Sequence, residues 1–202
     1  LVLAGGVAGG FLGPGLVSLA KDWLATPFLG SFLLLAAVAF VALGVQSLLH
    51  VPRPHAHERH GGRPLAAIAR QPVFVVAVLS AALGYGVMNL LMVATPLAMS
   101  FCQHPFAAAA FVIQWHVVGM YAPGFVTGEL IRRFGVLTVI AAGVAFVGGC
   151  VAIALAGDTI AHFTVALMLL GIGWNFMYTG GTTLLTEAYE PSEKARVQGF
   201  ND

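Results

Sequence analysis

Long uncharged stretches are the feature that most constrains what this sequence can fold into. Only 8% of its 202 residues are charged, and 59% are hydrophobic. A soluble domain usually carries about 25% charged residues. The few charges gather at separate points, and the runs between them are long enough for a helix of about 20 residues to cross a bilayer. The sequence therefore predicts a membrane protein.

Six apolar runs follow one another, and each is continuous instead of alternating. Lipid permits only helices and closed barrels, and continuous runs favour helices. We therefore expect an all-α polytopic membrane protein with six transmembrane helices. The chain starts inside an apolar run and ends where another helix opens, which is typical of an internal fragment of a larger protein. The predicted spans are residues 1–20, 25–50, 73–99, 107–128, 135–156 and 161–185.

Basic residues fall almost entirely on one side of the predicted spans. Residues 51–72, the one long polar interval, hold four arginines and four prolines. Loops on the same side as this interval contain eight of the nine basic residues, and the opposite loops contain only Lys21. Cytoplasmic loops carry such an excess. We expect the interval, the loop 129–134 and the tail 186–202 to be cytoplasmic. The protein would lie in a bacterial-type inner membrane, with both ends of the fragment on the cytoplasmic side.

Polar and aromatic side chains near the middle of the spans are candidates for a substrate pathway. A mid-bilayer amide must find a hydrogen-bonding partner or a wet cavity, so such residues mark functional sites. Hydrogen bonding between helices is the structural alternative for each of them. No Asp, Glu, Lys or Arg lies deep in the spans, which favours a neutral or amphipathic substrate, and proton coupling through these spans would need His116. The candidates are Asn89, Gln114, Tyr121, Trp174, Asn175 and Tyr178.

The histidines of the polar interval raise a metal hypothesis that the rest of the sequence does not support. His55, His57 and His60 are closely spaced, as zinc ligands can be. A metal-cation transporter with a His-rich cytoplasmic loop would also need paired ligands inside its spans, and none are visible. A solvated basic linker is the favoured interpretation. We expect no metal site, no cofactor, no nucleic-acid partner and, since no catalytic constellation is visible, no enzyme activity.

Glycines in the first span form two parallel rows. Gly5, Gly9 and Gly13 recur every four residues, beside a second row of Gly6 and Gly10, and such spacing lets helix backbones approach closely. Pro14 follows and should bend the helix. A packing face and a kinked, moving helix are both open. The run from Gly9 to Pro14 resembles the Gly-x-x-x-Gly-Pro signature in the fifth helix of major facilitator superfamily transporters. Its trailing glycines, associated with antiporters, are replaced by Val17 and Ser18.

A second motif closes the fourth span. Glycines give a tight turn its backbone freedom, and arginines hold it on the cytoplasmic side. The stretch is similar to the Gly-x-x-x-Asp-Arg-x-Gly-Arg loop between the eighth and ninth helices of the same superfamily, with Gly128 in the place of the acid and Glu129 after it. The motif residues are Gly124, Gly128, Glu129, Arg132, Arg133 and Gly135.

Spans three and six share Leu-Gly-x-Gly followed by an asparagine, Asn89 in one and Asn175 in the other. A repeat of three helices would produce this pattern. In the superfamily, helices seven and ten form such a pair, and the first motif gives the same numbering. The resemblance implies helices five to ten of a twelve-helix fold.

That numbering divides the chain into four parts. Residues 1–50 would be the last two helices of the N-terminal half, 51–72 the central cytoplasmic loop, 73–185 the first four helices of the C-terminal half, and 186–202 a cytoplasmic connection. The resemblance implies a secondary active transporter, of permease or efflux type, that moves a small solute by alternating access. The bilayer, the solute and a coupling ion such as a proton would be its partners. A non-transporting membrane scaffold is the alternative.

Overall fold

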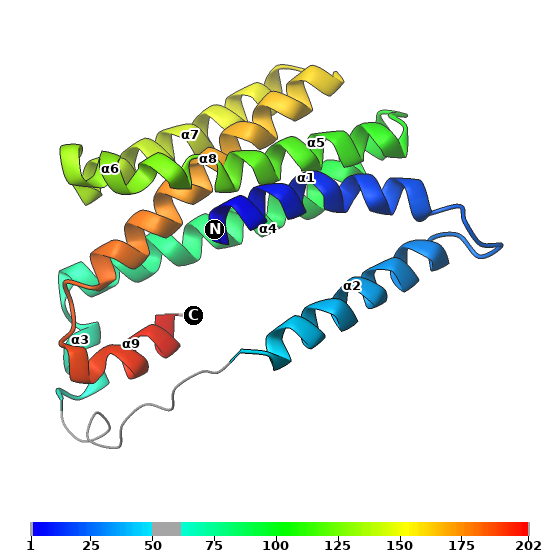
Figure 1. Ribbon diagram of the computed structural model, residues 1–202. Coiled ribbons are helices and arrows are strands. Elements are labelled where there is room, and N and C mark those ends of the chain that lie inside the picture. The colour runs from blue at the N-terminus through cyan, green and yellow to red at the C-terminus, as the bar shows by residue number, and fades with distance from the viewer. Residues whose placement is uncertain (1, 50–61, 202) are drawn as a thin grey trace.

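The structure, a computed structural model, describes residues 2–49 and 62–201, and within these ranges it contains helices and turns but no strand. This confirms the predicted all-α class. Figure 1 shows the helices running roughly along one direction, with α2 set apart from the others. The elements are α1 (Val2–Ala20), α2 (Leu29–Ser47), α3 (Leu65–Ala69), α4 (Pro72–Phe101), α5 (Phe106–Tyr121), α6 (Gly124–Phe134), α7 (Val136–Ala156), α8 (Ile160–Leu185), the 3₁₀ helix η2 (Pro191–Glu193) and α9 (Lys194–Asn201).

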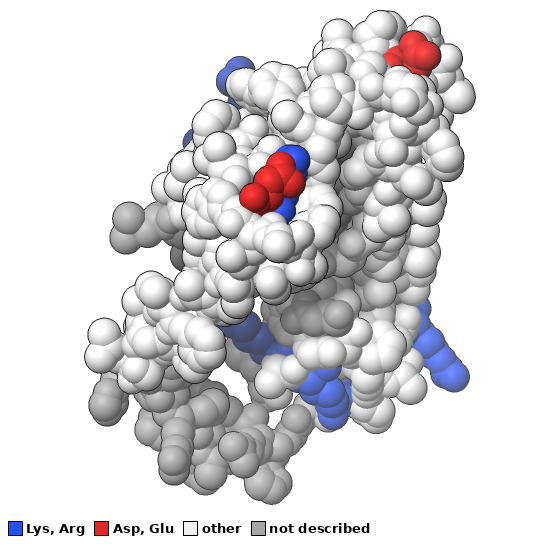
Figure 2. Space-filling view, turned by 90° about the vertical axis from the view of Figure 1, so that its right-hand side faces the viewer, with Lys and Arg blue, Asp and Glu red and all other residues white. Residues whose placement is uncertain are grey.

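The six predicted spans correspond to these helices with some differences in length. In the described ranges, four helices are by themselves long and apolar enough to cross a membrane, namely α2, α4, α7 and α8. The pair α5 and α6 makes a fifth if it is counted as one bent span. The remaining predicted span is α1, an apolar helix that counts as shorter, over Ala4–Ala20. One face of the molecule shows how sparse the charged side chains are (Figure 2).

The end of the fourth predicted span was placed wrongly. Residues 129–134 were expected to be a loop, but helix α6 continues to Phe134. The break instead lies between Tyr121 and Gly124, where α5 and α6 meet at an angle of 41°. Pro123 explains this position, because a proline has no N–H to continue the helical ladder and bends the chain. Two helical segments therefore replace one span and a loop.

Helix α8 is the centre of the bundle and packs against α4, α5 and α7. Glycines permit the closest approaches. A Cβ atom built on Gly171 would lie 2.5 Å from the carbonyl oxygen of His116 in α5. One on Gly181 would lie 2.7 Å from the Ala77 carbonyl oxygen in α4. Real Cβ atoms do not come this close to backbone, so only glycine allows these crossings.

Helix α1 packs against α5 through the second glycine row of the sequence. Cβ atoms built on Gly6 and Gly10 would overlap the side chains of Tyr121 and Val117. Cβ atoms on the first row, Gly5, Gly9 and Gly13, would meet no atom within 4 Å in the described part of the chain. The close α1–α5 contact is therefore made by the row beside the one that carries the superfamily signature.

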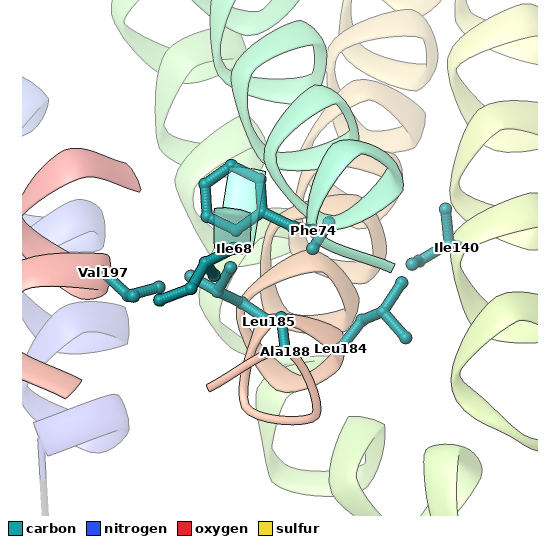
Figure 3. Packing of buried hydrophobic residues seen from close by; sticks show 8 residues of the cluster. Ile68, Phe74, Ile140, Leu184, Leu185, Ala188 and Val197 are labelled. Carbon is teal, nitrogen blue, oxygen red and sulfur yellow. The ribbon is translucent and has the colours of Figure 1, made fainter. Parts of the chain in front are cut away.

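The end of the polar interval is more ordered than a solvated linker. Residues Leu65–Ala69 form helix α3, and Ile68 is fully buried. Figure 3 shows Ile68 with Phe74, Leu185 and Val197 in one hydrophobic cluster that joins α3, α4, α8 and α9. The histidines of the interval, His55, His57 and His60, lie outside the described residues.

Candidate functional site

Three aromatic rings from α4 and α8 lie together. Trp174 and Tyr178 are one helical turn apart in α8, and their rings stack with centroids 5.0 Å apart and an interplanar angle of 9°. The ring of Tyr85 in α4 lies 6.5 Å from Trp174 and 6.3 Å from Tyr178. These distances are typical of favourable aromatic pairs. We call Tyr85, Trp174 and Tyr178 the ring cluster.

Two of the predicted residues thus meet in the ring cluster, and a third lies one turn away. Asn89 is exposed, and its side-chain nitrogen donates a hydrogen bond of 3.0 Å to the backbone carbonyl of Tyr85. This is a bond within α4, so the side chain joins no other described helix. Asn89 and Tyr85 therefore occupy the same face of α4, as their spacing of four residues requires.

The ring cluster contains a buried hydrogen-bond donor without an acceptor. Trp174 is only 9% exposed, and its Nε1–H finds no partner among the described residues. Most buried polar groups are hydrogen-bonded, and an unsatisfied one costs free energy. A cavity of about 390 Å³ lies beside Tyr85 and Tyr178 and is also lined by Ala81, Ala82, Gly86 and Asn201. Pockets of roughly 300–1,000 Å³ are usual for small-molecule sites.

Asn175 points to a different part of the bundle. It is 3% exposed, and its side-chain nitrogen donates to the carbonyl oxygen of Met120 at 2.7 Å. Its side-chain oxygen lies 2.6 Å from the hydroxyl of Thr127, which is also 2.8 Å from the Pro123 carbonyl. These contacts tie α8 to the bend between α5 and α6. They are the interhelical hydrogen bonds that were the structural alternative for this residue.

Gln114 and Tyr121 form a separate group on the α1 side of α5. The Gln114 amide donates to the carbonyl oxygen of Phe11 at 2.6 Å. Tyr121 lies against Gly6. The six predicted residues are thus divided among the ring-cluster face, the α5–α6 bend and the α1–α5 contact.

The loop motif is built around an exposed ion pair and a glycine turn. Arg132 donates two hydrogen bonds to the Glu129 carboxylate, at 2.6 and 2.9 Å. The guanidinium of Arg133 lies 5.4 Å from the ring centre of Phe134. Gly135 has a φ of 85°, a left-handed conformation that glycine adopts without a Cβ penalty. This residue makes the sharp turn into α7, whereas Gly124 and Gly128 lie within α6.

A second polar centre joins the segment before α3 to the segment before α9. The buried carboxylate of Glu193 accepts hydrogen bonds from the backbone N–H, Nε and Nη2 of Arg63, at 2.6, 3.0 and 2.8 Å. It also accepts one from the Glu190 N–H, and Arg63 donates a further bond to the Ala188 carbonyl. The hydrogen bonds from Arg63 hold the pKa of Glu193 at about 2, below its usual 4.5. We call this pair the Arg63–Glu193 clamp.

Comparison with known proteins decides the family. The family model of the Major Facilitator Superfamily matches residues 1–202. The chain belongs to this superfamily. The predicted family is therefore confirmed, and with it the predicted class of multi-pass membrane protein. The superfamily itself is a class of transporters and not of enzymes.

Curated relatives from two bacteria share the superfamily. The riboflavin transporter RfnT of Brucella anthropi is 40% identical over 207 residues, which cover 100% of this chain and 52% of the relative. The uncharacterized MFS-type transporter YddS of Bacillus subtilis is 30% identical, over 100% of this chain and 51% of the relative. YdeG of the same organism is 29% identical, over 96% and 49%. The chain thus spans about half the length of these relatives. No solved structure matches it significantly.

Two features of the structure, namely Tyr85 in the ring cluster and the Arg63–Glu193 clamp, were not predicted from the sequence. Tyr85 shares a helical face with Asn89, so the spacing could have added it to the candidates. The Arg63–Glu193 clamp has no local signal, because 130 positions separate its partners. In the described part of the tail, the acid that forms an ion pair is Glu193, and its partner is Arg63.

Proposed function

We propose that the full-length protein is a transporter that moves a small, uncharged, ring-bearing solute across the membrane, with riboflavin as the first candidate. The observation that carries this proposal is the ring cluster, which presents stacked aromatic surface beside a cavity. Helices α4 and α8 contain no Asp, Glu, Lys or Arg, so no fixed charge there would neutralise a charged substrate. The relative named a riboflavin transporter is 40% identical across the whole chain, which directs the choice of solute.

Alternating access is the mechanism we propose, with the chain contributing to both halves of a twelve-helix fold. In this proposal residues 1–50 end the N-terminal half, 51–72 connect the halves, 73–185 begin the C-terminal half and 186–202 lead to the next helix. The contact between α1 and α5 supports it, because Gly6 and Gly10 bring a helix before the connecting segment against one after it. Such a contact would have to slide or open as the halves rock.

We place residues 51–72, the cytoplasmic end of α6 and the tail on the inner side of an inner membrane, from the excess of basic residues there. A proton is the proposed coupling ion. Within α1, α2, α4, α5, α7 and α8, the described residues include no carboxylate. Coupling through this chain would therefore fall to His116, whose Nδ1 lies 2.8 Å from the Leu167 carbonyl and whose Nε2 has no partner among the described residues.

Measurements of riboflavin uptake and export in cells test the proposal. A riboflavin-requiring bacterial strain without its own riboflavin transporter, expressing the full-length gene, should grow at low external riboflavin and accumulate labelled riboflavin above the vector control. Preloaded cells should be examined in parallel, so that export is detected too. Riboflavin movement equal to the vector control in both directions would reject riboflavin as the substrate. A scaffold, the alternative function, predicts that outcome for every solute.

A further inference from the structure

The ring cluster is buried at Trp174 but leaves the Tyr85 side of its aromatic surface uncovered by the described residues. Tyr85 is 50% exposed even though it contacts both aromatic rings of α8. The stacked pair of Trp174 and Tyr178 provides flat, polarisable area with few rotatable bonds, which binds planar ligands at low entropic cost. A structural cluster of this kind would be buried on all sides.

The cavity beside the cluster has room on the α4 side. Three of its lining residues, Ala81, Ala82 and Gly86, have small side chains or none. A Cβ atom built on Gly86 would meet no atom within 4 Å. Gly86 is therefore not needed for helix packing among the described residues. Gly84, two residues earlier in α4, differs, because a Cβ atom built on it would lie 3.1 Å from the Met177 side chain.

The unpaired indole N–H is the third and independent observation. Trp174 keeps a polar donor in a nearly dry place where leaving it unpaired costs free energy. Phenylalanine would also stack on Tyr178, over a smaller area, without that cost. The two rings that contact Trp174, Tyr85 and Tyr178, both line the cavity. A donor held without an acceptor next to such rings is what a site needs when the acceptor arrives with the ligand.

We propose that Trp174 and Tyr178 form the subsite for a planar heteroaromatic ring, with Trp174 Nε1–H donating a hydrogen bond to an acceptor on the edge of that ring. The inference rests on the proposed function and deepens it. Riboflavin consists of a flat three-ring system with carbonyl oxygens and ring nitrogens on its edge, and a flexible polyol chain. The subsite recognises the ring system, Gly86 leaves clearance for it, and the polyol chain contributes little at this place.

The experiment uses the purified full-length protein in liposomes and measures riboflavin transport. Lumiflavin, which keeps the three rings and lacks the polyol, should compete with riboflavin, whereas ribitol should not. Trp174→Phe removes the N–H together with part of the ring area and should raise KM by at least about three- to tenfold, the change of about 0.5–1.5 kcal/mol expected for one hydrogen bond. Tyr178→Leu removes stacking area and should raise KM by about tenfold, whereas Tyr178→Phe keeps the ring and should transport normally.

A matched glycine pair tests the clearance. Gly86→Leu fills the space beside the rings and should abolish transport while the protein remains folded. Gly148→Leu makes the same change in α7 at an exposed glycine with no neighbour within 4 Å, and should transport normally. A thermal unfolding curve of each variant separates loss of binding from loss of folding.

The outcomes separate the inference from the function on which it rests. No riboflavin transport by the wild type would overturn the proposed function. Normal transport with an unchanged KM in Trp174→Phe and Tyr178→Leu, or competition by ribitol and not by lumiflavin, would overturn the subsite alone. A lower unfolding temperature in Trp174→Phe at unchanged KM would assign the N–H to a helix outside this chain segment and would equally overturn the subsite.

Discussion

Trp174 and Asn175 are neighbours in α8, are both buried, and have opposite hydrogen-bonding fates. The amide of Asn175 uses its nitrogen on Met120 and its oxygen on Thr127. The indole N–H of Trp174 has no partner among the described residues. Consecutive residues of a helix point about 100° apart, so one side chain enters the seam with α5 and α6 while the other lies beside α4.

The difference separates a closed face of α8 from an open one. The closed face has glycines at backbone-to-backbone distance and the fully paired amide of Asn175, so it fixes the positions of the helices. The open face has aromatic surface, a cavity and an unmet donor, so it can accept something else. Burial by itself does not distinguish the two, because Trp174 and Asn175 are 9% and 3% exposed. The hydrogen bonding of the two side chains distinguishes them, because Asn175 is paired and Trp174 is not paired within the described residues.

The largest effect is expected on the closed face. Gly171→Leu places side-chain atoms where the His116 carbonyl and the Met120 N–H already lie, so α5 must move away from α8. Overpacking costs about 1–3 kcal/mol where side chains can shift, and more where the obstacle is backbone. The tagged full-length variant should yield little monodisperse protein in size-exclusion chromatography, while Gly148→Leu should match the wild type. Normal yield and unfolding temperature for Gly171→Leu would mean that the two faces do not differ in this way.

The Arg63–Glu193 clamp, which lies outside the spans, resembles the closed face in having buried polar groups that are paired. Arg63→Ala removes two side-chain donors and leaves the Glu193 carboxylate, whose side chain is 0% exposed, without its counter-charge. Breaking a buried pair by removing one partner is strongly destabilising. The unfolding temperature should fall by on the order of 5 °C. Arg132→Ala, at an arginine that is 78% exposed in its pair with Glu129, is the control and should change little.

The clamp also predicts a pH dependence of stability. Hydrogen bonds from Arg63 lower the pKa of Glu193 to about 2 from 4.5. Because the folded pKa is the lower one, the stabilisation is complete above about pH 4.5 and is lost as the pH falls toward 2. Unfolding curves between pH 7 and 3 should therefore show a steeper loss on acidification for the wild type than for Arg63→Ala. Parallel curves would show that the clamp does not set this pKa.

Two asparagines at matching points of the shared sequence pattern give a smaller and more direct test. Asn175→Leu removes the amide donor to the Met120 carbonyl and leaves the Thr127 hydroxyl with the Pro123 carbonyl alone. This should cost about 1–3 kcal/mol and lower the unfolding temperature without changing KM. Asn89→Leu removes only an exposed bond within α4 and should leave the unfolding temperature unchanged. We propose that Asn89 lines the substrate pathway, so the KM for transport by the Asn89→Leu variant should rise. The reverse pattern would exchange the roles of the two residues.

The sequence predicted the membrane class and the superfamily because hydrophobic runs and glycine motifs are local. It also predicted Trp174 and Tyr178 as candidates. It could not separate Trp174 from Asn175, since their roles depend on which neighbouring helix each one meets. The sequence motif lies on the row of Gly5, Gly9 and Gly13, but the row that contacts α5 is that of Gly6 and Gly10. Which row makes this contact depends on the rotation of α1 against α5, which the sequence of α1 alone does not define. Pro123 indicates in the sequence where a helix can bend. The continuation of α6 to Phe134 instead depends on tertiary packing.

The smallest expected effect on stability is at the loop motif. Glu129 and Arg132 are 57% and 78% exposed in their side chains, and such pairs contribute about 0–1 kcal/mol. Glu129→Gln should therefore leave the unfolding temperature within about 1 °C of the wild type. The motif is proposed to act in the conformational cycle, so the transport rate of the full-length variant should fall although its stability does not. A variant with unchanged rate and unchanged stability would remove this pair from the mechanism, and the proposed direct roles in transport would then rest on residues within the spans.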